Sequence, residues 1–292
     1  MKHLIIYSTI VTSIFFSSCS NYLDIVPEND IETIETIFEK REQAELWLKS
    51  CYVLMTDPVS SVIVNPAFTG TDEVVAGEYT RQLLTTQHRW QWYGLFIGDG
   101  LQMVQEPYAN IWKKDLFYAA IRYCNIFFEK IGGVYNMPDN EKALWVAELK
   151  ALKAQLYFEL MRRYEVNSDI EIMQQPRSPI DTCVNTIVRL LDEAMKVLPP
   201  FMQKDQSRWT YHSLESAATL KAQVLLYAAS PLFNGNPAYT NFKNKKGEQL
   251  FNTTYDHEKW KRAAEATDEA IQLCLDGGRQ LVTGNMSKST EL

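Results

Sequence analysis

The sequence lacks the short motifs that mark most catalytic and metal sites. Its five cysteines include no Cys-x-x-Cys pair, and none stands with a histidine at the spacing that zinc sites use. Its histidines are isolated: His3, His88, His212 and His257. There is no Gly-x-Ser-x-Gly, no His-Glu-x-x-His and no phosphate-binding loop. These absences favour a binding protein over a metalloenzyme or a serine hydrolase.

Positive charge is also scarce. The chain has 29 lysine and arginine residues against 36 aspartate and glutamate residues, a formal net charge of −7. Broad nucleic-acid binding needs a basic face, which this balance does not favour. A hydrophobic fraction of 46% and a charged fraction of 22% are those of an ordinary globular protein.

No apolar run is long enough to cross a membrane as a helix. The apolar stretch over residues 4–16 is shorter than the roughly 20 residues that a spanning helix needs, and polar residues follow it closely. With Lys2 before it, the stretch matches a secretory signal. Two serines then precede Cys19, as in a bacterial lipoprotein box. We expect a signal peptide over residues 1–18 and a lipidated Cys19; the alternative is cleavage nearby that leaves Cys19 as a free thiol.

Apolar periodicity predicts a mainly helical mature chain over residues 19–292. At one helix start, Ser178 is expected to be the N-cap with Pro179 in the first helical position. Asp256 is expected to cap the last helix, which ends at two glycines. The expected helices cover residues 31–55 (as one or two helices), 107–131, 138–164, 178–198, 210–230 and 256–276.

Two short sequences recur within these helices. Leu-Lys-Ala-Gln at 152–155 returns at 220–223, and Asp-Glu-Ala at 192–194 returns at 268–270. The offsets predict two alternating helix types whose hairpins recur after about seventy residues, like tetratricopeptide repeats with longer loops. The alternative is an irregular helical bundle in which the short matches arise by chance.

Several stretches, in this order, resemble the RagB/SusD family of outer-membrane nutrient-binding lipoproteins. They are residues 21–27 after Cys19, residues 151–164, residues 176–199 with their Arg-Ser-Pro start, and the Trp-x-x-Ala-Ala helix at 255–270. The family usually continues with Gly-Pro after the position of Tyr164, where this chain has Glu165. Members are also substantially longer, so the resemblance covers an N-terminal portion and the C-terminal portion is missing.

The resemblance implies a tetratricopeptide-like superhelical scaffold on the outer face of the outer membrane. Members cap a SusC-like TonB-dependent transporter and pass oligosaccharides, or in some cases peptides, into it. Members bind their ligands but catalyse no reaction, and the resemblance implies no cofactor or metal.

The loop-rich region over residues 60–105 is where we expect the ligand. Its helical period is weak, and loops of that length in a compact domain are often functional. Exposed aromatic rings stack on sugars, and polar side chains orient them. The candidates, which no family motif marks, are Trp90, Trp92 and Tyr93 for stacking with Arg81 and Asp72 as polar partners. Trp112, Trp145 and Trp260 lie on expected helices and are assigned to packing.

Two other functions stay open. A lipid-anchored glycosidase needs two carboxyls about 5–10 Å apart, and no pair in the sequence suggests one. A pure protein–protein scaffold would use its helix faces instead of its loops. The remaining cysteines, Cys51, Cys124, Cys183 and Cys274, are expected to be buried thiols, with a disulfide possible in an exported protein. The last helix is expected to leave Trp260, Ala264 and Ile271 partly uncovered.

Overall fold

The computed structural model describes residues 34–53, 71, 75, 77–79, 82, 100, 116–162 and 177–279. This described part is mainly helical and contains no strand, only isolated bridges such as Asn234–Asn252. Its helices are α2 Ile34–Ile37, α3 Arg41–Val53, α7 Leu116–Lys130, α8 Asp139–Arg162, α9 Ile180–Met195, α10 Leu214–Ala229 and α11 His257–Asp276. Short 3-10 turns connect them: η2 Ile131–Gly133, η4 Phe201–Gln203, η5 Gln206–Arg208 and η6 Pro237–Tyr239.

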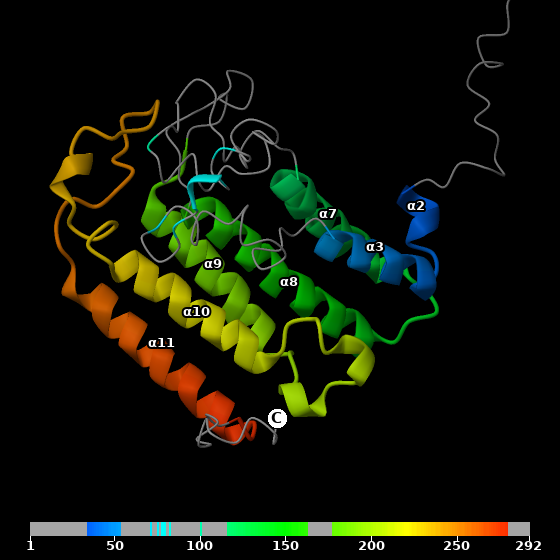
Figure 1. Ribbon diagram of the computed structural model, residues 1–292. Helices are drawn as coiled ribbons and strands as arrows, with labels where there is room; N and C mark the ends of the chain where they lie inside the picture. Colours follow the sequence, from blue (N-terminus) through cyan, green and yellow to red (C-terminus); the bar gives the residue numbers. More distant parts are fainter. Residues whose placement is uncertain are drawn as a thin grey trace, which may run out of the picture.

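Helices that are neighbours in sequence are neighbours in space. The helices α8, α9, α10 and α11 lie side by side, and α3 and α7 pack on the other side of α8 (Figure 1). The expected mainly helical fold with tetratricopeptide-like hairpins is confirmed.

Helix α8 is the centre of this arrangement because both of its faces are apolar. Its leucines, among them Leu149, Leu152 and Leu156, pack with α3 and α7 in one buried cluster. Its alanines, among them Ala147 and Ala151, pack with α9, α10 and α11 in the other. The small side chains let the next helices approach closely, whereas the leucines fill the wider space on the opposite face.

The sequence repeat has a structural counterpart. Lys153 of α8 donates to Asn125 Oδ1 of α7 at 2.6 Å, and its repeat equivalent Lys221 of α10 reaches Asp192 Oδ1 of α9 at 2.8 Å. In both cases the lysine of the Leu-Lys-Ala-Gln sequence binds a polar residue on the preceding helix. Lys221 also contacts Glu269 of α11 at 3.0 Å, so both Asp-Glu-Ala sequences contribute to its ion pairs. This agreement argues against a chance match.

Two local predictions are wrong. Pro179, with extended backbone angles, is itself the N-cap of α9, and Ser178 makes no capping bond. The amide of Ile180 instead donates to the Leu250 carbonyl at 2.9 Å, so a distant loop supplies the partner for the first helical N–H. Within the region expected to be loop, Glu78, Tyr79 and Gln82 are helical, in line with the good helix propensity of Glu and Gln.

The start of α11 agrees with its prediction. Asp256 is the N-cap, and its side chain accepts from the Glu258 amide at 2.9 Å. The helix ends at Asp276 with Gly277 as its C-cap, and Gly278 follows with a positive φ of 75°.

Candidate functional site

The sequence-predicted site lies outside the described residues. This holds for Trp90, Trp92 and Tyr93, for Arg81 and Asp72, and for Cys19. Among the tryptophans assigned to packing, Trp145 is fully buried as expected, and Trp112 lies outside the described residues. Trp260 is 38% exposed, as expected for a last helix that is left partly uncovered. The described part therefore leaves the stacking platforms as a prediction and shows the scaffold beside which they were expected.

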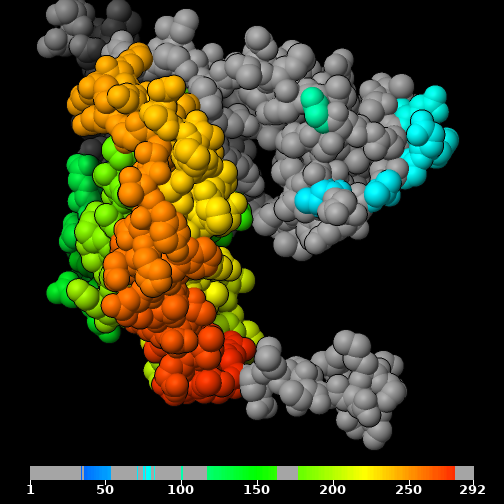
Figure 2. All heavy atoms as spheres, turned by 90° about the vertical axis from the view of Figure 1, so that its left-hand side faces the viewer, coloured from blue at the N-terminus to red at the C-terminus, as the bar shows by residue number. Residues whose placement is uncertain are grey.

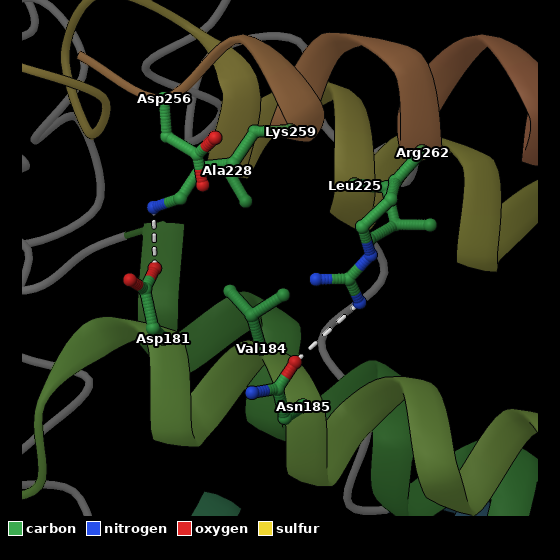
Figure 3. A pocket seen from close by; sticks show the side chains of 8 residues that line it. All are labelled: Asp181, Val184, Asn185, Leu225, Ala228, Asp256, Lys259 and Arg262. Carbon is green, nitrogen blue, oxygen red and sulfur yellow. Dashed lines mark hydrogen bonds and ion pairs between the residues drawn. The ribbon is translucent and has the colours of Figure 1, made fainter.

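A small polar groove opens where α9, α10 and α11 meet (Figure 3). Lys259 Nζ lies 2.5 Å from Asp181 Oδ1, and Arg262 Nη2 lies 3.4 Å from Asn185 Oδ1. Both contacts join α11 to α9. The rest of the lining is Val184 of α9, Leu225 and Ala228 of α10, and Asp256.

A buried asparagine side chain fixes the backbone of Asp256, one of the residues that line this groove. Asn234 is buried, and its side chain donates to the Asp256 carbonyl at 2.8 Å while accepting from the Asp256 amide at 2.8 Å. Beside it, Gly235 has a φ of 79°, and a Cβ there would come within 2.8 Å of Tyr255. The glycine therefore lets the chain pass close to the start of α11 and fixes Asp256 at the groove.

The groove can offer polar contacts but cannot enclose a ligand. Its two cations face two carboxylates, so its formal charge is balanced. Its volume of about 120 Å³ is below the several hundred that ligand sites usually have. A balanced set of amide, carboxylate and guanidinium groups suits hydrogen bonding to an uncharged ligand better than capture of an ion.

One exposed ring stands next to the groove in sequence. Tyr255, which is 58% exposed, precedes Asp256. Sequence reasoning did not single it out, nor did it identify Asn185 or Arg262. Helical periodicity reports which residues face the core, and it carries no signal for polar residues on two helices that meet only after folding.

Aromatic rings of the loop between α10 and α11 pack against one another and against α10. Phe251 stacks on Tyr239 with centroids 4.2 Å apart and on Phe233 at 5.7 Å. Phe233 in turn lies 5.6 Å from Tyr227 of α10. This cluster is well packed, so the loop rests on a fixed base.

A second polar constellation is buried between α3, α8 and η5. Glu148, with no exposed surface, is ion-paired with Arg208, whose Nε also donates to Oε1 at 3.2 Å. Lys204 Nζ lies 3.8 Å from the same carboxylate and donates to the carbonyls of Tyr211 and His212 at 2.6 and 2.8 Å. The sequence signal for this cluster is a glutamate inside an apolar helical stretch.

Burial dominates the ionisation of this cluster. It raises the pKa of Glu148, an effect that the hydrogen bonds and charge of Arg208 oppose. Burial likewise lowers the pKa of Lys204, against the attraction of Glu148. Burial and the positive charge of Lys204 lower the pKa of His212 to about 4.

Comparison with solved structures identifies the fold. The chain is 29% identical to the protein BT4246, with a TM-score of 0.73 over 86% of this chain and 42% of that one. A SusD-like protein from Bacteroides fragilis is 18% identical, with a TM-score of 0.58 over 86% and 41% of the two chains. A laminarin-binding SusD-like protein is 20% identical, with a TM-score of 0.52 over 66% and 41%. The chain has the SusD-like fold.

This fold supports the assignment to the RagB/SusD family that the sequence resemblance indicated. No family model matches the sequence, and the search of curated proteins gives no significant match. The chain spans about two-fifths of the length of the solved structures it matches.

One described carboxyl can be compared with the needs of a glycosidase. Such an enzyme needs an accessible acid with a raised pKa. The carboxyl of Glu148 has a raised pKa, but it is buried and held by Arg208, out of reach of a substrate. Among the described helices, none is long and apolar enough to span a membrane.

Proposed function

We propose that this protein binds glycans on a SusD-like helical scaffold. The single observation that carries the proposal is the fold, which is shared with a protein described as laminarin-binding and with a SusD-like carbohydrate-binding protein from Bacteroides vulgatus that has a TM-score of 0.51 and 15% identity. The balanced charge of the groove at Asp181 and Lys259 agrees with an uncharged polar ligand.

The proposed contacts combine two kinds of group. Trp90, Trp92 and Tyr93 stack on the apolar faces of sugar rings, with Arg81 and Asp72 as hydrogen-bonding partners. Within the described part, we propose the groove residues Asn185 and Arg262, with the exposed ring of Tyr255, as further polar and aromatic contacts. A rigid helical stack suits the task because a site on a preorganised scaffold loses less entropy on binding.

Affinity electrophoresis of the full chain tests this proposal. Gels containing laminarin and other neutral polysaccharides should retard the chain, and a Trp90→Ala/Trp92→Ala double variant should lose most of the retardation. Trp209→Ala is the matched control, because Trp209 is also an exposed tryptophan. It follows the C-terminal end of α9, whereas the groove lies at the N-terminal end of this helix, which is about 24 Å long. Equal mobility on all glycans would contradict glycan binding; retention by peptides instead would favour the peptide-binding alternative.

We further propose that the protein is anchored by lipid to the surface of the outer membrane. The support is the sequence pattern ending at Cys19 together with the fold. In a bacterial host, radiolabelled palmitate should enter the wild-type chain and a Cys183→Ala control but not a Cys19→Ala variant. Equal labelling of the Cys19 variant would refute lipidation at this cysteine.

The proposed partner is a SusC-like TonB-dependent transporter that receives the glycan. The family resemblance supports this assignment. Co-expression with a SusC-like protein should give a complex that survives purification. Quantitative separation of the two proteins under gentle detergent conditions would argue for a scaffold or free binding protein instead.

A further inference from the structure

The outer face of α11 carries a row of apolar side chains that stay exposed. Trp260 is 38% exposed, Ile271 53% and Leu275 55%, and Ala264 lies exposed between them. These four residues form the apolar stripe of α11. In Figure 1, α11 is the last helix of the row α8–α11 and packs on α10. The stripe is therefore a helix face at the edge of the stack.

The internal repeat indicates which kind of element fits this face. The two Asp-Glu-Ala sequences are 76 residues apart (268 − 192), an offset that places Trp260 and Ile271 of α11 at the positions of Val184 and Met195 of α9. Val184 is buried, and Met195 packs against the same apolar cluster, to which α10 also contributes. The equivalent face of α9 is thus covered by a helix.

The covering helix α10 runs antiparallel to α9. Val184, near the N-terminal end of α9, lines the groove together with Leu225 and Ala228, near the C-terminal end of α10. Helix α11 has the same direction as α9, because Asp181 and Lys259 pair near the N-terminal ends of the two helices. The stripe of α11 therefore matches a face that takes an antiparallel helix.

We propose that the stripe binds α11 of a second copy of this chain, antiparallel, about a two-fold axis beside Ala264. Lys261 and Asp268 are exposed and seven residues apart, so they lie within about 20° of each other around the helix. Their midpoint falls next to Ala264, and an axis there sets each Lys261 opposite Asp268 of the partner subunit. An axis midway between Trp260 and Leu275 would instead place the two Asp268 carboxylates side by side, which like charge disfavours.

The apolar side chains fit the same register. The two Ala264 methyl groups meet at the axis, where small side chains allow close approach of the helices. Trp260 lies 4.5 residues before the midpoint at 264.5, and the pair Thr267 and Ile271 is centred at 269, which is 4.5 residues after it. Each Trp260 ring therefore enters the space between Thr267 and Ile271 of the partner subunit.

The contact is formed by one pair of helices, so the dimer is weak and reversible. Helix α11 has 20 residues and is about 30 Å long. A single pair of such helices buries less surface than a standard stable interface. The dimer should therefore depend on protein concentration.

Sedimentation velocity over a concentration series that reaches the millimolar range tests the proposal. The full chain carries Cys19→Ala, so that no lipid contributes to association. Lys261→Glu and Asp268→Lys should each weaken the dimer by roughly 2- to 30-fold, because each removes two ion pairs per dimer. The double swap Lys261→Glu/Asp268→Lys should restore it. Glu129→Lys is the matched control, since it makes a similar charge change at an exposed position of α7.

Three results of the series would overturn the proposal. They are a wild-type chain that stays monomeric at every concentration, a dimer that neither single swap weakens, and a double swap that associates no better than the singles. Monomeric behaviour would leave the stripe to a different partner.

Cross-linking tests the register separately. Under mild oxidation, an Ala264→Cys/Cys274→Ala variant should form a disulfide-linked dimer in which tryptic peptide 263–279 is joined to its own copy. The control is Glu265→Cys/Cys274→Ala, whose new thiol lies on the same turn but about 100° farther round the helix. Equal cross-linking of the two variants would contradict an axis beside Ala264.

Discussion

At the residue scale, Glu148 is a charged side chain with no exposed surface. Its carboxylate is buried with two cations, and breaking one partner of such a cluster leaves charge without compensation. The ion pair joins α8 to η5, the turn between α9 and α10 that carries Arg208. The ion pairs of this cluster therefore fix the position of η5 against α8.

Glu148→Gln should lower the free energy of unfolding by about 3–5 kcal/mol, because Arg208 and Lys204 then stay buried without a counter-charge. Guanidinium unfolding followed by circular dichroism measures this loss. The matched control is Glu193→Gln, which removes partly exposed ion pairs with Lys150 and Arg189 and should cost less than about 1 kcal/mol. Equal losses in the two variants would contradict the assignment.

His212 should make stability depend on pH. Its pKa of about 4 lies below the usual value near 6.5. Between these two pH values the histidine is protonated in the unfolded chain and neutral in the folded chain. The contribution of His212 to the free energy of unfolding is therefore fully present above about pH 6.5 and is lost as the pH falls toward 4. Glu148, whose pKa is raised, acts with the opposite sign, so the wild-type curve contains both effects.

Comparison with a His212→Gln variant isolates the histidine. The difference in unfolding free energy between wild type and variant should shrink as pH drops from 7 to 4. An NMR titration should find the His212 ring neutral down to about pH 5. A ring that titrates near 6.5 would contradict the burial argument.

At the element scale, helix ends distinguish what local sequence determines from what tertiary structure determines. Asp256 caps α11 as its sequence predicts, because the bond to Glu258 is local. Ser178 does not cap α9, because the Leu250 carbonyl from the α10–α11 loop binds the first amide there. A local rule fails where a distant segment provides the partner.

Asp256→Ala should therefore reduce the free energy of unfolding by about 1 kcal/mol, through loss of the cap on α11. Ser178→Ala should change it by no more than about 0.5 kcal/mol, since the exposed Ser178 makes no capping bond. Thermal or denaturant unfolding of the two variants side by side gives the comparison. A larger loss for the Ser178 variant would restore the original prediction.

At the scale of the whole molecule, sequence periodicity predicted the helices and their order but not the site. The leucine stripe of α8 and the recurring lysines at 153 and 221 carried enough signal for the stack. The alanine face of α8 and the groove at Asn185 and Arg262 carried none. Their roles depend on which helices meet, and this is a property of packing. The predicted ligand residues from Asp72 to Tyr93 lie outside the described residues and stay predictions.

The outer face of α11 forms an apolar stripe on the side of the stack. Figure 2 shows α11 running along the surface on the side turned to the viewer. Trp260 is 38% exposed, Ile271 53% and Leu275 55%, and Ala264 is exposed between them, as the sequence predicted for Trp260, Ala264 and Ile271. Exposed apolar patches of this kind favour association.

An Ile271→Lys/Leu275→Lys variant should remain monomeric at several-fold higher concentration than the wild type. Light scattering over a concentration series measures this. Leu46→Lys is the control, because Leu46 is an exposed leucine on α3, away from the stripe, and its replacement should leave the association unchanged. Association that depends equally on both sites would contradict a role for the stripe.

The most direct test of the account is thermal unfolding of the chain by circular dichroism, with and without a saturating neutral glycan. A SusD-like stack that binds glycans should unfold in one cooperative helical transition, and the glycan should raise its midpoint, because a ligand that binds only the folded state stabilises it. A broad, non-cooperative loss of helix, or a midpoint unmoved by every glycan tested, would contradict the central claim.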